Sequence, residues 1–427
     1  MSAPRAAPGP VRVIGMGGAL LITTNGMIGS GIFSLPGKLD AAVGSFAPIL
    51  LLIAALGFAC IALSVADCAR HFDASGGPIL YVGAAFGRFP GFLTGWLSYV
   101  ARGSAQAANA NVIALTAAAL FPATAGPGAR GAIIVTLFAA LIALNMVGLR
   151  KALVALSGIT LLKLAPLILL AAAALARFGA GATPTVPPLP DVEGVALVAL
   201  YAFTGFEIGS LAAGETRDPK RALPIALVGT VMSVGLLYIL VQWAYSGSAP
   251  TNSEAPLVEL ARRIGGPIAA FALGLTILFS VIGGITVSIL GASRQTVGMA
   301  EQGMLPARFA YFSPRFATPT FSILVYGLGA MALALSGSFV FLAVVSTLAR
   351  LISYLGCILA APRLDRIFAS PRRWPRRFLF PGIAATLCVW AASQSTATEW
   401  RSLVMFAVIG GALYRLAVRA APAPRRA

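Results

Sequence analysis

The sequence contains few charged residues for its length. Asp, Glu, Lys and Arg make up 10% of its 427 residues, whereas 58% of the residues are hydrophobic. Soluble globular chains are about one quarter charged, and a soluble domain of this size could not remove so much apolar surface from water. The composition therefore excludes a soluble globular protein and indicates an all-α polytopic membrane protein.

The residues that build metal sites and acid–base centres are also scarce. The one histidine, His71, lies in a polar segment beside Arg70 and Asp73, where we expect it to be solvated. The four cysteines fall in or at the ends of apolar runs without the spacing of metal ligands: Cys60, Cys68, Cys357 and Cys388. The sequence thus predicts no metal and no cofactor, and it argues against an enzyme.

Long apolar runs are what the sequence has instead. Each run is long enough to cross the ~30 Å hydrocarbon layer as a helix, and about twelve of them are expected. The segment before the first run is polar and no small-residue cleavage site follows it, so we expect a retained span and no signal peptide. The predicted spans are 12–36, 46–69, 88–120, 130–149, 151–178, 194–213, 222–245, 267–293, 319–336, 338–362, 378–395 and 400–418.

The net charge of +18 is explained by topology, since Lys and Arg are concentrated on one side of the predicted spans. With the N-terminus inside, most of the 31 basic residues lie at inner loops and span ends. The positive-inside rule then places both termini in the cytoplasm. The basic excess also suits contact with anionic lipid, and we expect no nucleic-acid partner. The outer side holds Lys38, Arg130, Arg177, Arg262, Arg263 and Arg401.

The first span contains a stretch that is unfavourable for a continuous helix. Residues 25–33 include Gly26, Gly29, Ser30 and Gly31 near mid-bilayer, followed closely by the large Phe33. Each glycine costs a helix about 1 kcal/mol relative to alanine. The alternative is a groove of small residues for close helix packing. The Gly-Ser-Gly sequence before a phenylalanine favours an interrupted helix.

The sixth span has a similar anomaly at 201–207, where a glycine, a threonine and Glu207 lie at one membrane depth. Interrupted helices are tolerated there only inside protein or beside a cavity. Their free N–H groups can hold a carboxylate, and their free C=O groups can hold an ammonium. Breaks in spans one and six also imply a five-helix unit used twice in opposite senses. We therefore predict repeats over 1–178 and 194–362, followed by two additional C-terminal helices over 378–418.

Five short motifs follow one another along the first ten spans. They are Gly29-Ser30-Gly31-Ile32-Phe33-Ser34-Leu35-Pro36, Ser75-Gly76-Gly77-Pro78 with Tyr81 and Ala85-Phe86-Gly87, Gly205-Phe206-Glu207, Glu215-Thr216-Arg217-Asp218-Pro219-Lys220-Arg221-Ala222-Leu223-Pro224, and Arg294 with Gly303-Met304-Leu305-Pro306. In this order and spacing, the motifs resemble those of the amino acid–polyamine–organocation (APC) transporters, the bacterial amino acid permeases. Spans eleven and twelve carry no motif.

The resemblance implies a midplane site for an amino acid. The amides of Ser30 and Gly31 should face its α-carboxylate, and the carbonyls of Met27, Tyr201 and Thr204 should face its ammonium. Tyr201 matches an aromatic that closes over substrate, although it could instead be packed in the bundle. The substrate-binding residues predicted in this way are Met27, Ile28, Gly29, Ser30, Gly31, Arg102, Gln106, Tyr201, Phe203, Thr204 and Gly205.

Four ionisable side chains lie well inside spans, where a functional role is the default expectation. Lys163 resembles a lysine that replaces a sodium site in some permeases. Burial removes water from its ammonium and so favours the neutral form of the side chain. It would then carry a coupling proton, or else remain a fixed charge on the carbonyls of the first break. Glu207 matches an acidic position linked to pH sensing or coupling, or it could be the counter-ion of Arg102 or Lys163. We expect a structural role for Arg350.

Arg102 is expected near the pocket for the substrate side chain, where it would disfavour cationic substrates and permit neutral or acidic ones. The leading interpretation is proton-coupled uptake of an L-amino acid by alternating access, in the bacterial inner membrane, with amino acid, protons and lipid as partners. The alternatives are an exchanger, a non-transporting sensor with the same fold, and a polytopic enzyme. The sequence names neither the substrate, the coupling stoichiometry nor the oligomeric state.

Overall fold

The computed structural model describes residues 14–72, 76–147, 155–179, 181, 183–211, 216–248, 253–369 and 377–420. Parts of predicted spans one, four, five and six lie outside these residues, at 12–13, 148–149, 151–154 and 212–213. So do the motif residues Ser75 and Glu215, Asp73 beside His71, and several basic residues that the topology argument used: Arg5, Arg12, Arg150, Lys151, Arg372, Arg373, Arg376, Arg425 and Arg426.

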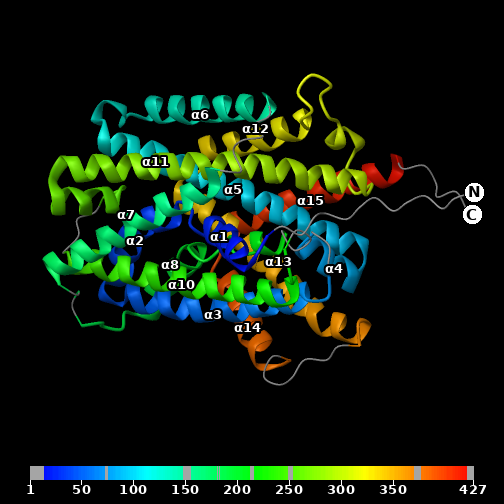
Figure 1. Ribbon diagram of the computed structural model, residues 1–427, viewed down its shortest axis with the longest axis horizontal. Coiled ribbons are helices and arrows are strands. Elements are labelled where there is room, and N and C mark those ends of the chain that lie inside the picture. Colours follow the sequence, from blue (N-terminus) through cyan, green and yellow to red (C-terminus); the bar gives the residue numbers. More distant parts are fainter. Residues whose placement is uncertain are drawn as a thin grey trace, which may run out of the picture.

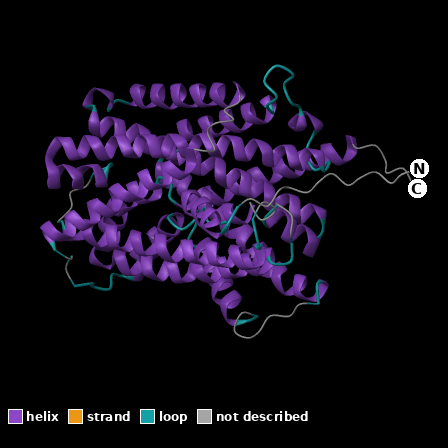
Figure 2. Ribbon diagram, in the orientation of Figure 1, coloured by secondary structure: helices purple, strands orange, loops and turns teal. Residues whose placement is uncertain are grey.

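Nearly all of the described chain is helical (Figure 2), apart from loops and a single bridge between Ile14 and Thr216. The helices of the first half are α1 (Met16–Met27), α2 (Gly31–Val43), η1 (Gly44–Phe46), α3 (Ala47–Ala69), α4 (Pro78–Phe86), α5 (Arg88–Leu120), η2 (Pro122–Thr124), α6 (Pro127–Val147) and α7 (Ala155–Phe178). Those of the second half are α8 (Leu189–Tyr201), α9 (Ile208–Leu211), α10 (Pro219–Gly247), α11 (Pro256–Glu301), η4 (Ala307–Ala310), α12 (Thr320–Ser336), α13 (Phe339–Ile367), α14 (Leu379–Ser393) and α15 (Ala397–Ala420).

Each apolar run predicted to span the membrane is mostly helical where the structure describes it, and the first and sixth are interrupted at 28–30 and 202–207. Six segments are long and apolar enough to cross a membrane on their own, judged by length and composition. The helices α12 and α14 are apolar but shorter. The six segments are Gly31–Ala69, Pro127–Val147, Pro219–Gly247, Pro256–Glu301, Phe339–Ile367 and Ala397–Ala420.

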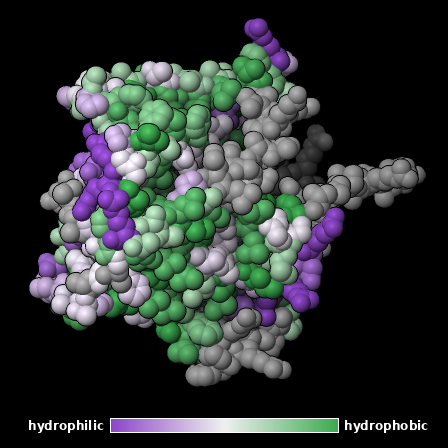
Figure 3. Space-filling view, turned by 60° about the vertical axis from the view of Figure 1, so that its left-hand side comes forward, coloured by the Kyte–Doolittle hydropathy of each residue, from purple (hydrophilic) through white to green (hydrophobic). Residues whose placement is uncertain are grey.

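The helices form an elongated bundle in which α11 extends along most of the length (Figure 1). The helix α13 packs along α5, and α10 packs along α3, so the first and second halves of the chain interleave. In the view of Figure 3, hydrophobic side chains cover the middle of the surface, while hydrophilic ones gather toward its left and right margins. This distribution suits a protein whose middle lies in lipid.

The three largest departures from the predicted boundaries involve α4, α2 and α11. A short helix, α4, lies between the second and third predicted spans, where none was expected. The helix α2 continues through Pro36 to Val43. The predicted span ended too early because it was cut where polar residues begin. The helix α11 starts before predicted span eight and has non-helical backbone at Gly265 and Gly266, where Gly266 has a φ of +69°.

Candidate functional site

The first predicted break is present in the structure. The helix α1 ends at Met27 and α2 begins at Gly31, with Ile28, Gly29 and Ser30 between them. The amide of Gly29 turns back to donate to the carbonyl of Met27 at 3.0 Å. The first amides of α2 have no intrahelical acceptor, so this junction offers N–H groups inside the bundle.

The second predicted break is also present, between the end of α8 at Tyr201 and the start of the four-residue helix α9 at Ile208. Gly205 in this turn has a φ of +101°, which residues with a side chain rarely adopt. The two breaks touch each other through their backbones. A methyl group added to Gly26 would lie 2.8 Å from the carbonyl oxygen of Gly205, so both positions require glycine.

The amide of Ser30 already has a protein acceptor in this structure. It donates to Oδ1 of Asn109 on α5 at 3.1 Å, and Nδ2 of Asn109 donates to Oε1 of Gln106 at 2.8 Å. The hydroxyls of Ser30 and Tyr201 lie 3.4 Å apart. Asn109 therefore accepts a hydrogen bond from the Ser30 amide, which was expected to face a substrate carboxylate. Gly31 is the first residue of α2 and lines the cavity.

Two of the three carbonyls expected to face an ammonium also have protein donors. The carbonyl of Met27 accepts from the Gly29 amide and from the hydroxyl of Tyr238 at 3.4 Å. The carbonyl of Tyr201 accepts from the amide of Thr204 at 3.2 Å and from its hydroxyl at 2.9 Å. An ammonium at these oxygens would have to share them or displace the donors.

The ammonium of Lys163 is buried against the first break. Its Nζ donates to Oδ1 of Asn25 at 2.8 Å and to the carbonyl of Ile28 at 3.3 Å, and the residue is 2% exposed. Both acceptors are neutral. The lysine of α7 thus holds the end of α1 and the interrupted backbone without a carboxylate among its described hydrogen-bond partners.

The carboxylate of Glu207 pairs with Arg350 of α13. It forms an ion pair through Oε1, while Oε2 accepts from the hydroxyl of Tyr354 at 2.7 Å and from the amide of Gly205 at 3.0 Å. The expectation that Glu207 is the counter-ion of Arg102 or Lys163 was wrong, because the side chain turns toward α13. The contact gives Arg350 an acidic partner inside the bundle, and the structural role suggested for it stays a prediction.

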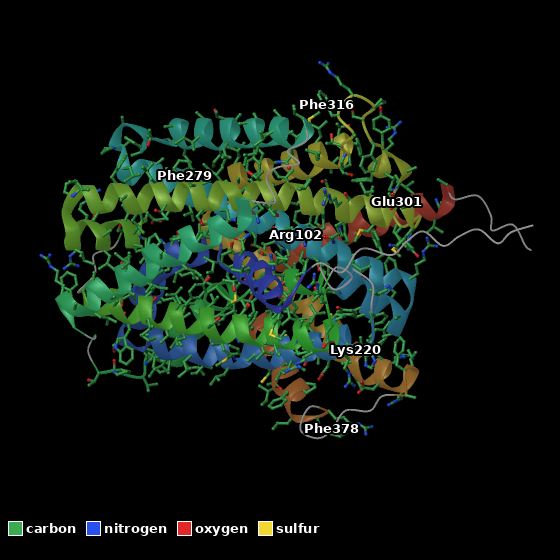
Figure 4. The ribbon with its side chains drawn as sticks, viewed as in Figure 1. Arg102, Lys220, Phe279, Glu301, Phe316 and Phe378 are labelled. Carbon is green, nitrogen blue, oxygen red and sulfur yellow. The ribbon has the colours of Figure 1, made fainter. Side chains whose placement is uncertain are left out.

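Arg102 occupies the middle of the bundle (Figure 4) and is 9% exposed. Its guanidinium makes no hydrogen bond or ion pair with any residue that the structure describes. A methyl group at Gly291 of α11 would lie 3.4 Å from its Nη1, and both residues line the same cavity. Gln106 follows Arg102 by one helical turn, so both lie on one face of α5.

These groups surround a cavity of about 1320 Å³ that begins at the two breaks. It extends to Arg88, Arg294 and Gln302, which are exposed at one end of the bundle. Toward the opposite end, the rings of Tyr201 and Phe339 are 6.0 Å apart. The cavity is therefore continuous with the surface that carries Arg88 and Arg294.

The opposite end of the bundle is held by polar contacts of α2. Nζ of Lys38 lies 3.1 Å from Oε1 of Glu254, and the hydroxyl of Ser246 donates to Oδ1 of Asp40 at 2.5 Å. Nε2 of Gln242 donates to the carbonyl of Pro36 at 3.3 Å. These contacts join α2 to α10 and to the segment before α11.

Most of the predicted site residues line the cavity, but some do not. Ser30, Gly205 and Glu207 lie behind its wall, and Phe203 is fully buried with its ring 5.7 Å from Phe58. Asn25, Asn109 and Gly291 were not predicted. The predicted site residues that line the cavity are Met27, Ile28, Gly29, Gly31, Arg102, Gln106, Lys163, Tyr201 and Thr204.

A signal for Asn109 was present in the sequence. Arg102, Gln106 and Asn109 recur at helical spacing along one face of an otherwise apolar segment, which marks a polar stripe. Asn25 and Gly291 had no comparable signal, because each acquires its role from a helix distant in sequence.

Comparison with known proteins gives a consistent set of relatives. A family model described as amino acid permease matches residues 14–412. An uncharacterised transporter of Mycobacterium tuberculosis (strain ATCC 25618 / H37Rv) is 31% identical over 346 residues, which cover 78% of this chain and 76% of that protein. The methylthioribose transporter of Bacillus subtilis (strain 168) is 26% identical over 416 residues, 91% of this chain and 90% of that protein. These names describe transporters and not enzymes.

Proposed function

Because this chain belongs to the amino acid permease family of the APC superfamily, we propose that it is a secondary transporter that takes up L-amino acids together with protons. The substrate would bind where the two helix breaks meet the cavity. Alternating access would expose this place first to one side of the membrane and then to the other. The observation that carries the proposal is the cavity itself, which joins both breaks to one end of the bundle.

The proposed architecture has about twelve spans. Two five-helix repeats, over 1–178 and 194–362, would run in opposite senses, and two further helices over 378–418 would complete the chain. In the bacterial inner membrane the end that carries Arg88 and Arg294 would face the cytoplasm, with both termini on that side. The cavity would then be open inward, which is a state that releases or awaits substrate.

The substrate would be held by backbone groups of the two breaks. Its α-carboxylate would lie at the amides of Gly31 and Ser30, which requires the side chain of Asn109 to give up the Ser30 amide. Its ammonium would approach the carbonyls of Met27, Tyr201 and Thr204. The Ser30 amide would thus bind Asn109 in the empty state and the substrate carboxylate in the loaded state. This difference in contacts could shift the balance between the conformations of the transporter.

Proton coupling is assigned to Lys163. Its ammonium rests on two neutral oxygens of the first break, so losing the proton would free Asn25 and the carbonyl of Ile28. Protonation and the geometry of the break would thereby be linked. Glu207 is already paired with Arg350, which supports a positioning role for it more than a role as proton carrier.

Uptake into proteoliposomes tests the proposal. Purified protein is reconstituted, and labelled amino acids are offered with and without an inward proton gradient. Accumulation above the equilibrium level that depends on the gradient supports symport. Uptake only against internal amino acid would indicate an exchanger, and binding without movement would indicate a sensor. Methylthioribose, the named substrate of one relative, is included, and uptake of it in place of every amino acid would overturn the amino acid assignment.

A further inference from the structure

The charges that line the cavity are all of one sign among the residues that the structure describes. The charged side chains of the lining are Arg88, Arg102, Lys163, Arg294 and Arg350, with no Asp or Glu from the described chain. The carboxylate of Glu207 lies behind the wall and neutralises Arg350. The inner part of the cavity therefore keeps an excess of positive charge, carried by Arg102 and Lys163.

Among these cations, Arg102 is the one for which a bound anion would be most favourable. It is more than nine-tenths buried, lines the cavity, and has no acceptor within the described residues. A buried charge is unfavourable unless it is paired and hydrogen-bonded, and a guanidinium cannot lose its proton to escape that penalty. Lys163, by contrast, already donates to Asn25 and to the carbonyl of Ile28.

The position of Arg102 along α5 indicates which part of a substrate it would meet. Asn109 lies at the Ser30 amide, where the α-carboxylate is proposed to bind. Arg102 is seven residues earlier on the same face, which is about 10 Å along a helix. A substrate whose backbone sits at the break would therefore reach Arg102 with its side chain, past Gln106.

Polar groups next to Arg102 complete this part of the cavity. Ser288, one turn before Gly291 on α11, lines the cavity, and its hydroxyl lies 2.8 Å from that of Tyr326. Gly291 leaves the space beside Nη1 open, since a methyl group there would meet no other heavy atom within 4 Å. An acidic group has room beside the guanidinium and a hydroxyl nearby.

We propose that the cavity selects substrates with an acidic side chain, so that Arg102 pairs with a carboxylate of the substrate while the substrate backbone occupies the helix breaks. The inference rests on the proposed function and goes further by naming the substrate class. Amino acids with amide side chains have the same shape as their acidic counterparts but lack the charge. They serve as matched controls.

Competition of unlabelled amino acids against the uptake of labelled glutamate in proteoliposomes tests this selection. We expect aspartate or glutamate to inhibit uptake at a concentration at least about tenfold lower than asparagine or glutamine, because opposite charges a few ångströms apart attract strongly in a partly dry site. In Arg102→Gln the ratio should fall to near unity. Lysine and arginine should be the weakest inhibitors of the wild type.

A second pair of variants keeps Arg102 in place. Gly291→Asp puts a carboxylate beside the guanidinium and should abolish the preference for acidic substrates, whereas Gly291→Asn adds the same bulk without charge and should retain it. This pair decides the question even if Arg102→Gln does not fold. Equal inhibition by acids and amides in the wild type, or a preference that survives Gly291→Asp, would overturn the inference while leaving amino acid transport intact. Failure of every amino acid to compete would instead reject the proposed function.

Discussion

Glu207, in the turn between α8 and α9, forms an ion pair with Arg350 of α13. Their side chains are 11% and 8% exposed. The same carboxylate accepts hydrogen bonds from Tyr354 and from the amide of Gly205. The irregular backbone of the second break is thus fixed to a long helix from near the end of the chain, which gives the break a defined shape inside the bundle.

The first prediction follows from this pair. Removing one partner leaves the other as an uncompensated buried charge, which costs about 3–5 kcal/mol. Glu207→Gln and Arg350→Met should each lower thermal stability in detergent, and the double variant should recover part of the loss. If Glu207→Gln were as stable as the wild type and lost only proton-driven accumulation, Glu207 would be a proton carrier and the positioning role assigned to it would be wrong.

The second prediction concerns the carboxylate site. A methyl group at Gly31 would lie 3.4 Å from Cα of Ala202 and 3.5 Å from Cδ1 of Tyr201. The further methyl groups of a valine therefore have little room beside the second break. Gly31→Val should abolish transport with expression retained, as measured by uptake in proteoliposomes.

A matched control for Gly31→Val is Gly329→Ala in α12, where an added methyl group meets no heavy atom within 4 Å. This variant should transport normally and be slightly more stable, because alanine favours a helix by about 1 kcal/mol over glycine. Normal transport by Gly31→Val would remove the substrate site from the first break.

The third prediction tests the direction in which the cavity opens. The four native cysteines are buried, so the wild type should react little with a membrane-impermeant maleimide. Gly298 lines the cavity, and a side chain there would meet no heavy atom within 4 Å. Gly298→Cys should be labelled in inside-out vesicles and less in right-side-out vesicles. The reverse pattern would contradict the assignment of the open end to the cytoplasm.

The sequence was sufficient for both breaks and for most of the helices, but not for α4 or for the start of α11. Apolar runs mark a helix that lies in lipid, and clustered glycines with Ser30 or Thr204 mark where it is interrupted. The end of α2 was predicted too early because hydropathy falls at Lys38 and Asp40. In the structure these side chains are held by Glu254 and Ser246, so the helix continues into a polar environment.

Contact of Lys163 with a carbonyl of the first break was one of the two alternatives drawn from the sequence, but the side-chain partners inside the site could not be predicted. Glu207 and Arg350 are 143 positions apart and Lys163 and Asn25 are 138 positions apart, so nothing local in the sequence joins them. Several buried cations were possible partners of Glu207, and the direction of its side chain determines that Arg350 is the partner. The same limit applies to Asn109 at the Ser30 amide, because that hydrogen bond depends on how α5 crosses the first break.

The most direct test of the account is the effect of Lys163 on accumulation. Lys163→Ala should abolish proton-driven accumulation in proteoliposomes, whereas exchange of internal for external substrate should continue because the substrate contacts remain. Lys163→Arg keeps a positive charge that cannot be lost, so it should also fail to accumulate. Undiminished accumulation by either variant would show that the buried charge is only structural and would contradict proton coupling through Lys163.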